Sequence, residues 1–271
     1  RLPVTRMSTA AVEGETARRP DAAGARVQDV DGNWYIDYIL GLGPITLGYC
    51  FPAVDEAVRA QLERGIIYGL LSPLEVEAAE AICDMVPCAE MVRFLKGGSE
   101  VTTAAARIAR GYTGRDLILN CGYRGWADGW SAESRAGEGG IPACVGEAIV
   151  GLPRYDLDAL AGLLDAHKGE VAAVFMDAIA YPTSPPDGYL EGVRALCDEH
   201  EVVLAFDEIV TGFRMAPGGA QEYFGVTPDL ACFAKGVANG MPVGVVCGRR
   251  EVMAVAEDLI ISVTYGGEAL S

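Results

Sequence analysis

A lysine follows a short apolar run near the end of the chain, in the stretch Leu230-Ala-Cys-Phe-Ala-Lys235-Gly. The run 230–233 predicts a buried strand, which places Lys235 at the carboxyl end of that strand, where open α/β sheets bind ligands. Because its neighbours are small or apolar, we expect desolvation to lower the pKa of the amine and make it nucleophilic. Such an amine forms Schiff bases with carbonyl compounds. The alternative is a solvated loop lysine, since charged side chains are usually exposed.

Two carboxylates, Asp207 and Glu208, come directly after another apolar run, 202–206. A carboxylate that faces a pyridine nitrogen keeps that nitrogen protonated, and the ring then accepts electrons from a carbanion. The alternatives for Asp207 are a helix N-cap or a structural ion pair with Arg214. Position alone leaves these interpretations open.

Gly97, Gly98 and Ser99 separate the apolar run 91–95 from a helical pattern. Glycines let backbone amides approach an anion, and a helix N-terminus favours negative charge, so this turn fits a phosphate grip. The turn lacks the spacing of a Walker or dinucleotide loop. Tyr123 follows the run 117–121 and is placed to stack on a flat cofactor, with ordinary packing as the alternative.

Apolar runs and helical patterns alternate between these residues. Runs that are apolar throughout indicate strands buried on both faces, and their alternation with helices predicts a mostly parallel α/β sheet. Upstream, Asp31-Gly-Asn33 supplies the turn of a β-hairpin, and Pro52 opens a helix. The stretch 131–147 is expected to be a surface loop. The predicted strands are 91–95, 117–121, 171–176, 202–206, 230–233 and 243–247, with helices near 74–86, 99–112, 156–167 and 188–200.

The composition excludes several classes of protein. The chain of 271 residues has 38 acidic and 21 basic side chains and a net charge of −17, which repels phosphate backbones, so we expect no nucleic-acid partner. The two histidines, His167 and His200, and eight cysteines without a CxxC pair predict no metal site. No run reaches the roughly 18 apolar residues of a membrane span, and the start carries no signal-peptide core. We therefore expect a cytoplasmic protein without membrane contact.

Several segments, taken together and in their order, resemble the class-III aminotransferases, and within them the glutamate-1-semialdehyde aminomutase branch. The match runs from about residue 27 to residue 271, and the spacing of 28 positions from Asp207 to Lys235 also fits. The segments that carry the resemblance are Phe206-Asp-Glu-Ile-Val-Thr-Gly-Phe-Arg214, Gly218-Gly-Ala-Gln-Glu-Tyr-Phe-Gly-Val-Thr-Pro-Asp229, Phe233-Ala-Lys-Gly236, Gly240-Met-Pro-Val-Gly244, Phe94-Leu-Lys-Gly-Gly-Ser-Glu100 and Asp29-Val-Asp-Gly-Asn33.

The resemblance implies a fold-type-I enzyme with the cofactor pyridoxal 5'-phosphate (PLP). By position, it implies that Lys235 holds the cofactor as a Schiff base and moves the proton, and that Asp207 pairs with the pyridine nitrogen. It also implies that Ile209 packs under the ring and Tyr123 stacks over it.

The same resemblance assigns the phosphate to the turn at 97–99, with Gly98 and Ser99 as its contacts. It implies a homodimer with shared active sites, in which Thr264, in Val263-Thr-Tyr-Gly-Gly267, reaches the phosphate of the partner subunit's cofactor.

Four departures from the family pattern are visible. Tyr123-Arg124-Gly125 stands where the family usually has Tyr-His-Gly. Asp177-Ala178 stands where the family usually has Glu-Pro, and the segment 177–188 is shorter than in the aminomutases. Family members also continue beyond the segment that matches 266–271, into a C-terminal small domain. On this basis we expect an N-terminal segment with a hairpin at 1–50 and a large PLP-binding α/β domain at 51–271, with the small domain missing.

The function expected from these observations is PLP-dependent amino-group transfer, by an aminotransferase or aminomutase, on a small amino or keto substrate. The alternatives are a PLP-dependent racemase, an aminotransferase acting on an amino sugar or cyclic ketone, and a non-catalytic homologue that binds a partner. Retention of Lys235 and Asp207 argues against the last, and the missing C-terminal portion argues for it. Arg6 is a candidate for binding a substrate carboxylate, and equally a solvated terminal residue.

Overall fold

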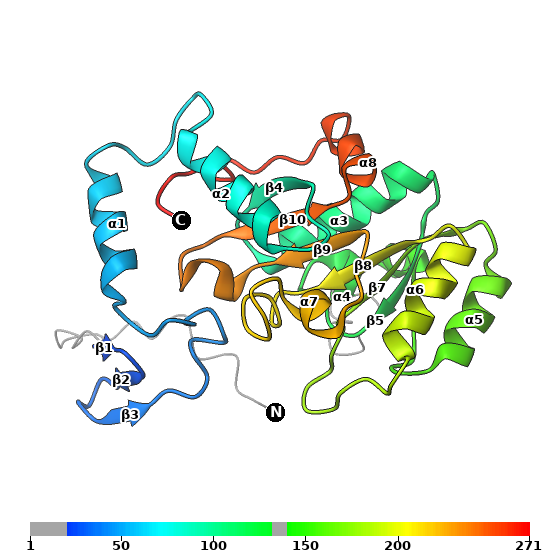
Figure 1. Cartoon of the computed structure of the whole chain (residues 1–271), viewed down its shortest axis with the longest axis horizontal. Helices are drawn as coiled ribbons and strands as arrows, with labels where there is room; N and C mark the ends of the chain where they lie inside the picture. Colours follow the sequence, from blue (N-terminus) through cyan, green and yellow to red (C-terminus); the bar gives the residue numbers. More distant parts are fainter. Residues whose placement is uncertain (1–20, 132–139) are drawn as a thin grey trace.

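The computed structural model describes residues 21–131 and 140–271, so the candidate Arg6 lies outside the described residues. In this part of the chain the main sheet has seven strands, and Figure 1 shows helices on both of its sides. In their order across the sheet the strands are β4 (Met91–Leu95), β10 (Gly244–Gly248), β9 (Leu230–Phe233), β8 (Val203–Asp207), β7 (Val171–Met176), β5 (Leu117–Cys121) and β6 (Ile149–Gly151).

Strand β10 runs antiparallel to both of its neighbours, whereas the strand pairs from β9 across to β6 are parallel. The connection from β9 to β10 explains the reversal, because a parallel pair needs a crossover of roughly a dozen residues or more. This short connection is residues 234–243, and it contains a 3₁₀ turn at Lys235–Ala238. The predicted mostly parallel α/β sheet is therefore confirmed, with one reversed strand.

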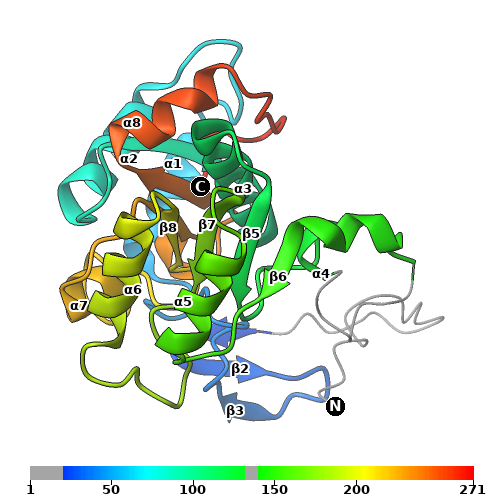
Figure 2. The ribbon, with the colours of Figure 1, turned by 90° about the vertical axis from the view of Figure 1, so that its right-hand side faces the viewer.

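Side chains of the central strands alternate between two apolar cores. On β8, Val203 and Ala205 join one core, whereas Leu204 and Phe206 join the other. This period of two is the signature of a strand buried on both faces. Figure 2 shows α5 and α6 side by side along β7 and β8. Helices α3 (Gly98–Thr113) and α8 (Arg250–Met253) cover the first face, and α2 (Pro73–Met85), α5 (Leu157–Ala166), α6 (Tyr189–Glu199) and α7 (Ala220–Phe224) cover the second.

The N-terminal part forms a small antiparallel sheet of β1 (Ala22–Ala23), β2 (Arg26–Gln28) and β3 (Trp34–Ile36). The expected hairpin is confirmed: one Asp29 carboxylate oxygen accepts hydrogen bonds from the amides of Asp31 and Asn33, at 3.0 and 2.9 Å, and Gly32 supplies a φ of 88°. Helix α1 (Pro52–Leu62) begins at the expected proline. In Figure 1 the hairpin and α1 lie to one side of the main sheet.

Differences from the sequence-based elements are confined to their ends and to short pieces. The strands expected at 202–206 and 243–247 lie one residue later. Strand β6 and helix α4 (Asp128–Ser131) were not predicted, because elements of three or four residues are too short to show a period. Of the surface loop expected at 131–147, residues 132–139 lie outside the described part, and Ala143–Ala148 form a 3₁₀ helix instead. Within the described ranges, no helix is long and apolar enough to cross a membrane.

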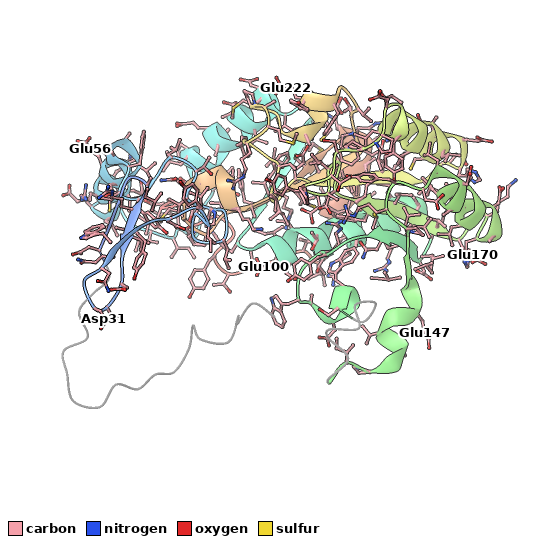
Figure 3. All side chains as sticks on the ribbon, turned by 90° about the horizontal axis from the view of Figure 1, so that it is seen from below. Asp31, Glu56, Glu100, Glu147, Glu170 and Glu222 are labelled. Atoms are coloured by element: carbon pink, nitrogen blue, oxygen red, sulfur yellow. The ribbon has the colours of Figure 1, made fainter. Side chains whose placement is uncertain are left out.

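Acidic side chains are distributed along the whole molecule. Figure 3 labels Asp31 at the hairpin and Glu56 on α1 at one end, Glu170 at the opposite end, and Glu222 on α7 between them. These labelled carboxylates therefore lie at both ends of the molecule and between them.

Candidate active site

Lys235 and Asp207 come together at one edge of the main sheet. Strands β5, β7, β8 and β9 are parallel, so their carboxyl ends lie at the same edge. Asp207 is the last residue of β8, and Lys235 lies two positions after β9. Burial lowers the pKa of Lys235, and the nearby negative charge of Asp207 partly opposes this effect.

The Lys235 amine is half-buried, and within residues 21–131 and 140–271 no hydrogen bond or ion pair engages it. Its pKa is lowered by burial and also by the positive charge of Arg214, against the opposing effect of Asp207. The chain has three lysines; Lys96 forms an ion pair with Glu268 at 2.6 Å, and Lys168 is exposed beyond α5. Lys235 is thus the lysine with a free, desolvated amine, as the sequence predicted, and not a solvated loop lysine.

A segment from the N-terminal part lies against Lys235. A Cβ atom at Gly43 would come 3.4 Å from the Lys235 side chain, and the Gly43 carbonyl accepts a hydrogen bond from Arg214. Asn239 binds the same segment, because its amide oxygen accepts from the Leu47 amide at 2.8 Å and its amide nitrogen donates to the Gly48 carbonyl at 3.1 Å. Gly43 therefore lies against the lysine, and residues 47–48 are tied to the loop that follows it, contacts that no pattern in the sequence revealed.

Asp207 is buried, with 6% of its surface exposed. One carboxylate oxygen accepts from the Ile209 amide at 3.0 Å, and the other accepts from Arg124 at 2.6 Å. Burial raises the pKa of the Asp207 carboxyl, and the positive charge of Arg124 opposes this rise. The alternative ion pair with Arg214 is wrong: Arg214 donates to backbone carbonyls, that of Val210 at 2.7 Å among them.

The neighbouring carboxylate, Glu208, has a structural role. Burial raises its pKa, and its oxygens accept from the backbone amides of Ala220 and Gln221, at 2.8 and 2.9 Å, and from the Thr211 hydroxyl. The two amides begin α7, so capping a helix, which was an alternative for Asp207, is done by Glu208.

The turn at 97–99 forms the N-terminus of α3. The Glu100 carboxylate accepts from the amides of Lys96 and Gly97, at 2.9 and 3.0 Å. The amides of Gly98 and Ser99 belong to the first turn, where no intrahelical acceptor exists, and no other acceptor for them lies in the described parts of the chain. The Ser99 hydroxyl oxygen accepts from the amides of Trp126 and Ala127, both at 3.1 Å, which leaves its proton to be donated elsewhere. The amides of Gly98 and Ser99 and the Ser99 hydroxyl thus remain as three donors for an anion. The Gly97 amide is already used.

Ile209 joins the turn at 97–99 to Asp207. A Cβ atom on Gly98 would come 2.9 Å from Cδ1 of Ile209, whose own amide binds Asp207.

Tyr123 lies at the carboxyl end of β5, and its side chain is open to solvent, with 74% of the residue exposed. Thr264 is exposed in a turn near β4, which is held by the ion pair between Lys96 and Glu268. The roles expected for these side chains stay predictions.

Sequence reasoning noted Arg124 and Asp177 only as departures from a pattern, and the structure places both beside Asp207. Arg124 forms ion pairs with Asp207 at 2.6 Å and with Asp177 at 2.8 Å. Their position in the sequence could have indicated this, because each follows a predicted strand and the carboxyl ends of parallel strands lie at one edge of the sheet.

The donors and acceptors of this edge fit PLP. An unpartnered amine suits its aldehyde, a buried carboxylate suits its pyridine nitrogen, and a helix N-terminus with three remaining donors suits its phosphate. Ile209, between the carboxylate and the phosphate turn, adds an apolar contact for a ring.

Comparison with known proteins agrees with this fit. The family model for "Aminotransferase class-III" matches residues 11–140 and 143–271. A glutamate-1-semialdehyde 2,1-aminomutase of Syntrophobacter fumaroxidans is 42% identical over 246 residues, which are 86% of this chain and 57% of that relative. The solved FumI protein of Sphingopyxis sp. MTA144, which contains PLP, superposes with a TM-score of 0.87 and 30% identity over 93% of this chain and 61% of its own.

A glutamate-1-semialdehyde aminomutase from Pseudomonas aeruginosa PAO1 has a TM-score of 0.82 and 26% identity, over 92% of this chain and 60% of its own. The chain therefore spans about three fifths of the length of these relatives. The comparisons confirm the fold-type-I architecture and PLP as the cofactor of the fold. With matches over nearly its whole described length, the chain belongs to the class-III aminotransferase family.

Proposed function

We propose that this chain forms the cofactor site of a PLP-dependent enzyme that transfers or migrates an amino group on a small amino or keto substrate. The observation that carries the proposal is the free Lys235 amine, which lies in one site with the buried Asp207 carboxylate and the anion-binding start of α3. The relatives named as aminomutases support the reaction class.

Each residue of the site has a distinct part in this proposal. Bound PLP supplies a protonated pyridine ring that withdraws electrons from a carbon that has lost a proton. Asp207 holds that ring nitrogen, and Ser99 with the Gly98 amide holds the phosphate. Lys235 would provide the amine that holds the cofactor covalently as a Schiff base. The substrate amine would displace it from the cofactor, and the freed Nζ atom would then accept and return the substrate proton. Ile209 and Tyr123 contact the two faces of the ring.

The proposed assembly is a homodimer with shared active sites. Large apolar side chains are exposed along the N-terminal part, an arrangement that marks interaction surfaces. Thr264 is exposed as well, and the proposal gives it contact with the phosphate in the partner subunit. The exposed apolar residues include Tyr38, Ile39, Leu42, Leu47, Ile67, Leu70 and Leu71.

Borohydride reduction of the PLP-loaded protein tests the proposal. It should leave a pyridoxyl group on Lys235, found by peptide mass spectrometry, and Lys235→Ala should lose both the label and turnover. A label on Lys96 or Lys168 would refute the assignment. Bleaching of the cofactor absorbance by an amino donor should accompany the reaction, and its absence with a broad panel of donors would favour a non-catalytic homologue.

A further inference from the structure

The side chain of Arg124 is completely buried at the carboxyl edge of the sheet, with 0% of its surface exposed. A buried cation is costly unless it is paired and hydrogen-bonded, so its partners identify its purpose. Arg124 lies between two carboxylates, Asp207 at the end of β8 and Asp177 immediately after β7.

Every donor of the Arg124 guanidinium is used within the protein. Nε donates to the Asn120 amide oxygen at 3.2 Å, and Nη1 donates to the Tyr123 carbonyl at 2.8 Å and to Asp207 at 2.6 Å. Asp177 accepts from Nη1 and Nη2, at 2.8 and 3.0 Å, and Nη2 also donates to the Cys121 carbonyl. The guanidinium has five N–H donors in a rigid plane, so these bonds fix its orientation and leave none for a substrate.

The charges alternate outward from Asp207. Asp207 contacts Arg124, Arg124 contacts Asp177, and Asp177 lies 3.5 Å from the partly exposed Arg154. Burial alone would lower the pKa of Arg124, but the hydrogen bonds and charges of Asp177 and Asp207 raise it above that of free arginine. Arg124 is therefore a permanent cation.

We propose that Arg124 is a positioning residue that keeps Asp207 ionised and correctly oriented for the pyridine nitrogen, and that Asp177 holds Arg124 in place. This inference rests on the proposed function, in which Asp207 faces that nitrogen. When a carboxylate and a pyridine nitrogen share a proton, the proton sits on the stronger of the two bases. A permanent cation on the second carboxylate oxygen stabilises the carboxylate anion, so the proton stays on the nitrogen.

The double variant Arg124→Gln/Asp177→Asn separates this role from folding. It removes one positive and one negative charge together, so Asp207 loses its cation while the net charge stays the same. Replacing both members of a buried pair is tolerated far better than removing one. The single variant Asp177→Asn keeps the contact of Arg124 with Asp207 and removes the negative charge of Asp177, which raises the pKa of Asp207, so the ring nitrogen should stay protonated in this variant.

Arg115→Gln is the matched control. Arg115 is also largely buried and donates to the backbone carbonyls of Val171, His200 and Glu201, but these lie at the amino ends of β7 and β8. The variant Arg115→Gln therefore measures how much stability the protein loses when a largely buried arginine away from the site is replaced.

Two measurements test the proposal without relying on turnover. Pyridoxamine phosphate binds without a covalent bond to Lys235, and its dissociation constant should rise about 10-fold or more in the double variant. With ¹⁵N-labelled pyridoxamine phosphate, the pyridine nitrogen resonance should be that of a protonated ring in the wild type and in Arg115→Gln. It should move toward a neutral ring in the double variant.

The possible results are distinguishable. If the wild type fails to bind pyridoxamine phosphate, the proposed function fails, and the positioning role falls with it. If the wild type binds and the folded double variant keeps both the affinity and the protonated resonance, the positioning role alone is overturned. A lowered melting temperature with an unchanged resonance in the double variant would show that Arg124 is purely structural.

Discussion

Arg124 and Asp177, 53 positions apart in the chain, meet in a two-point ion pair beside Asp207, with distances of 2.8 and 3.0 Å. These are the two strand-end positions at which the sequence departs from the pattern of its family. Because the departures are in contact, they form one altered unit, in which a bulky permanent cation is matched by a carboxylate that anchors it.

Asp207→Asn should impair the reaction far more than folding. Asparagine keeps the shape and one acceptor oxygen but removes the charge that holds the pyridine nitrogen protonated. We expect turnover to fall by at least about 10²-fold, or about 2.7 kcal/mol of barrier. Steady-state kinetics of the PLP-loaded variant, with urea unfolding as the folding control, is the measurement. Unchanged turnover with bound PLP would assign this work to another group.

The acid–base behaviour of Lys235 should be visible in labelling without cofactor. Burial lowers the pKa of its amine from the ordinary value of 10.5, so in the folded protein its unprotonated fraction grows at a lower pH than in the unfolded chain. A depressed folded-state pKa also means that this group's contribution to stability is present above pH 10.5 and is lost as the pH falls through the folded value.

Competitive labelling with an amine-reactive ester, followed residue by residue over pH, checks this prediction. The midpoint for Lys235 should lie below 10.5 in the native protein and shift upward in urea. A midpoint that is the same in both states would show that burial does not activate the amine. At neutral pH, Lys235→Met should make the cofactor-free protein more stable, because it removes a half-buried charge.

Gly125→Ala should disrupt the phosphate turn. Gly125 has a φ of 113°, and a Cβ atom there would lie 2.8 Å from Cα of Ser99, which is backbone and cannot swing away. We expect the dissociation constant for pyridoxamine phosphate to rise about 10-fold and the free energy of unfolding to fall by about 1–3 kcal/mol. Gly129→Ala is the control, because a Cβ atom at Gly129 meets nothing within 4 Å. Equal effects of the two substitutions would contradict the prediction.

Thr264→Ala should weaken both cofactor retention and dimer formation. A ligand held by two subunits stabilises the dimer by mass action, so PLP should shift a dilute sample toward dimer. Sedimentation at several concentrations, with and without PLP, measures this shift, and Ser262→Ala, an exposed hydroxyl in the same segment, is the control. A monomer fully loaded with PLP would rule out a shared site.

The local part of this architecture could be predicted from the sequence. The runs 91–95, 117–121, 171–176 and 230–233 became β4, β5, β7 and β9 with the predicted bounds. In β7 and β9 the reason is burial on both faces, which leaves an unbroken apolar pattern. The same pattern placed Lys235 and Asp207 at strand ends, and therefore at one edge of the sheet.

What the sequence did not show is which strand ends are neighbours. Arg214 was the natural partner for Asp207 because it is seven positions away, whereas Arg124 is 83 positions away. The pairing follows from the order β8-β7-β5 across the sheet, and a periodic pattern carries no information about strand order. The contact of Gly43 with Lys235 escaped prediction for the same reason.

The reversed strand β10 has a consequence for synthesis. Strand β4 and the phosphate turn that follows it leave the ribosome early, yet the one neighbour of β4 in the main sheet is β10, which contains residues 244–248. Until that segment emerges, β4 has an unpaired edge, which is prone to join the strands of other chains. A nascent chain stalled before residue 244 should therefore need chaperone protection, and its cofactor site should close only when the last strand of the sheet inserts between β4 and β9.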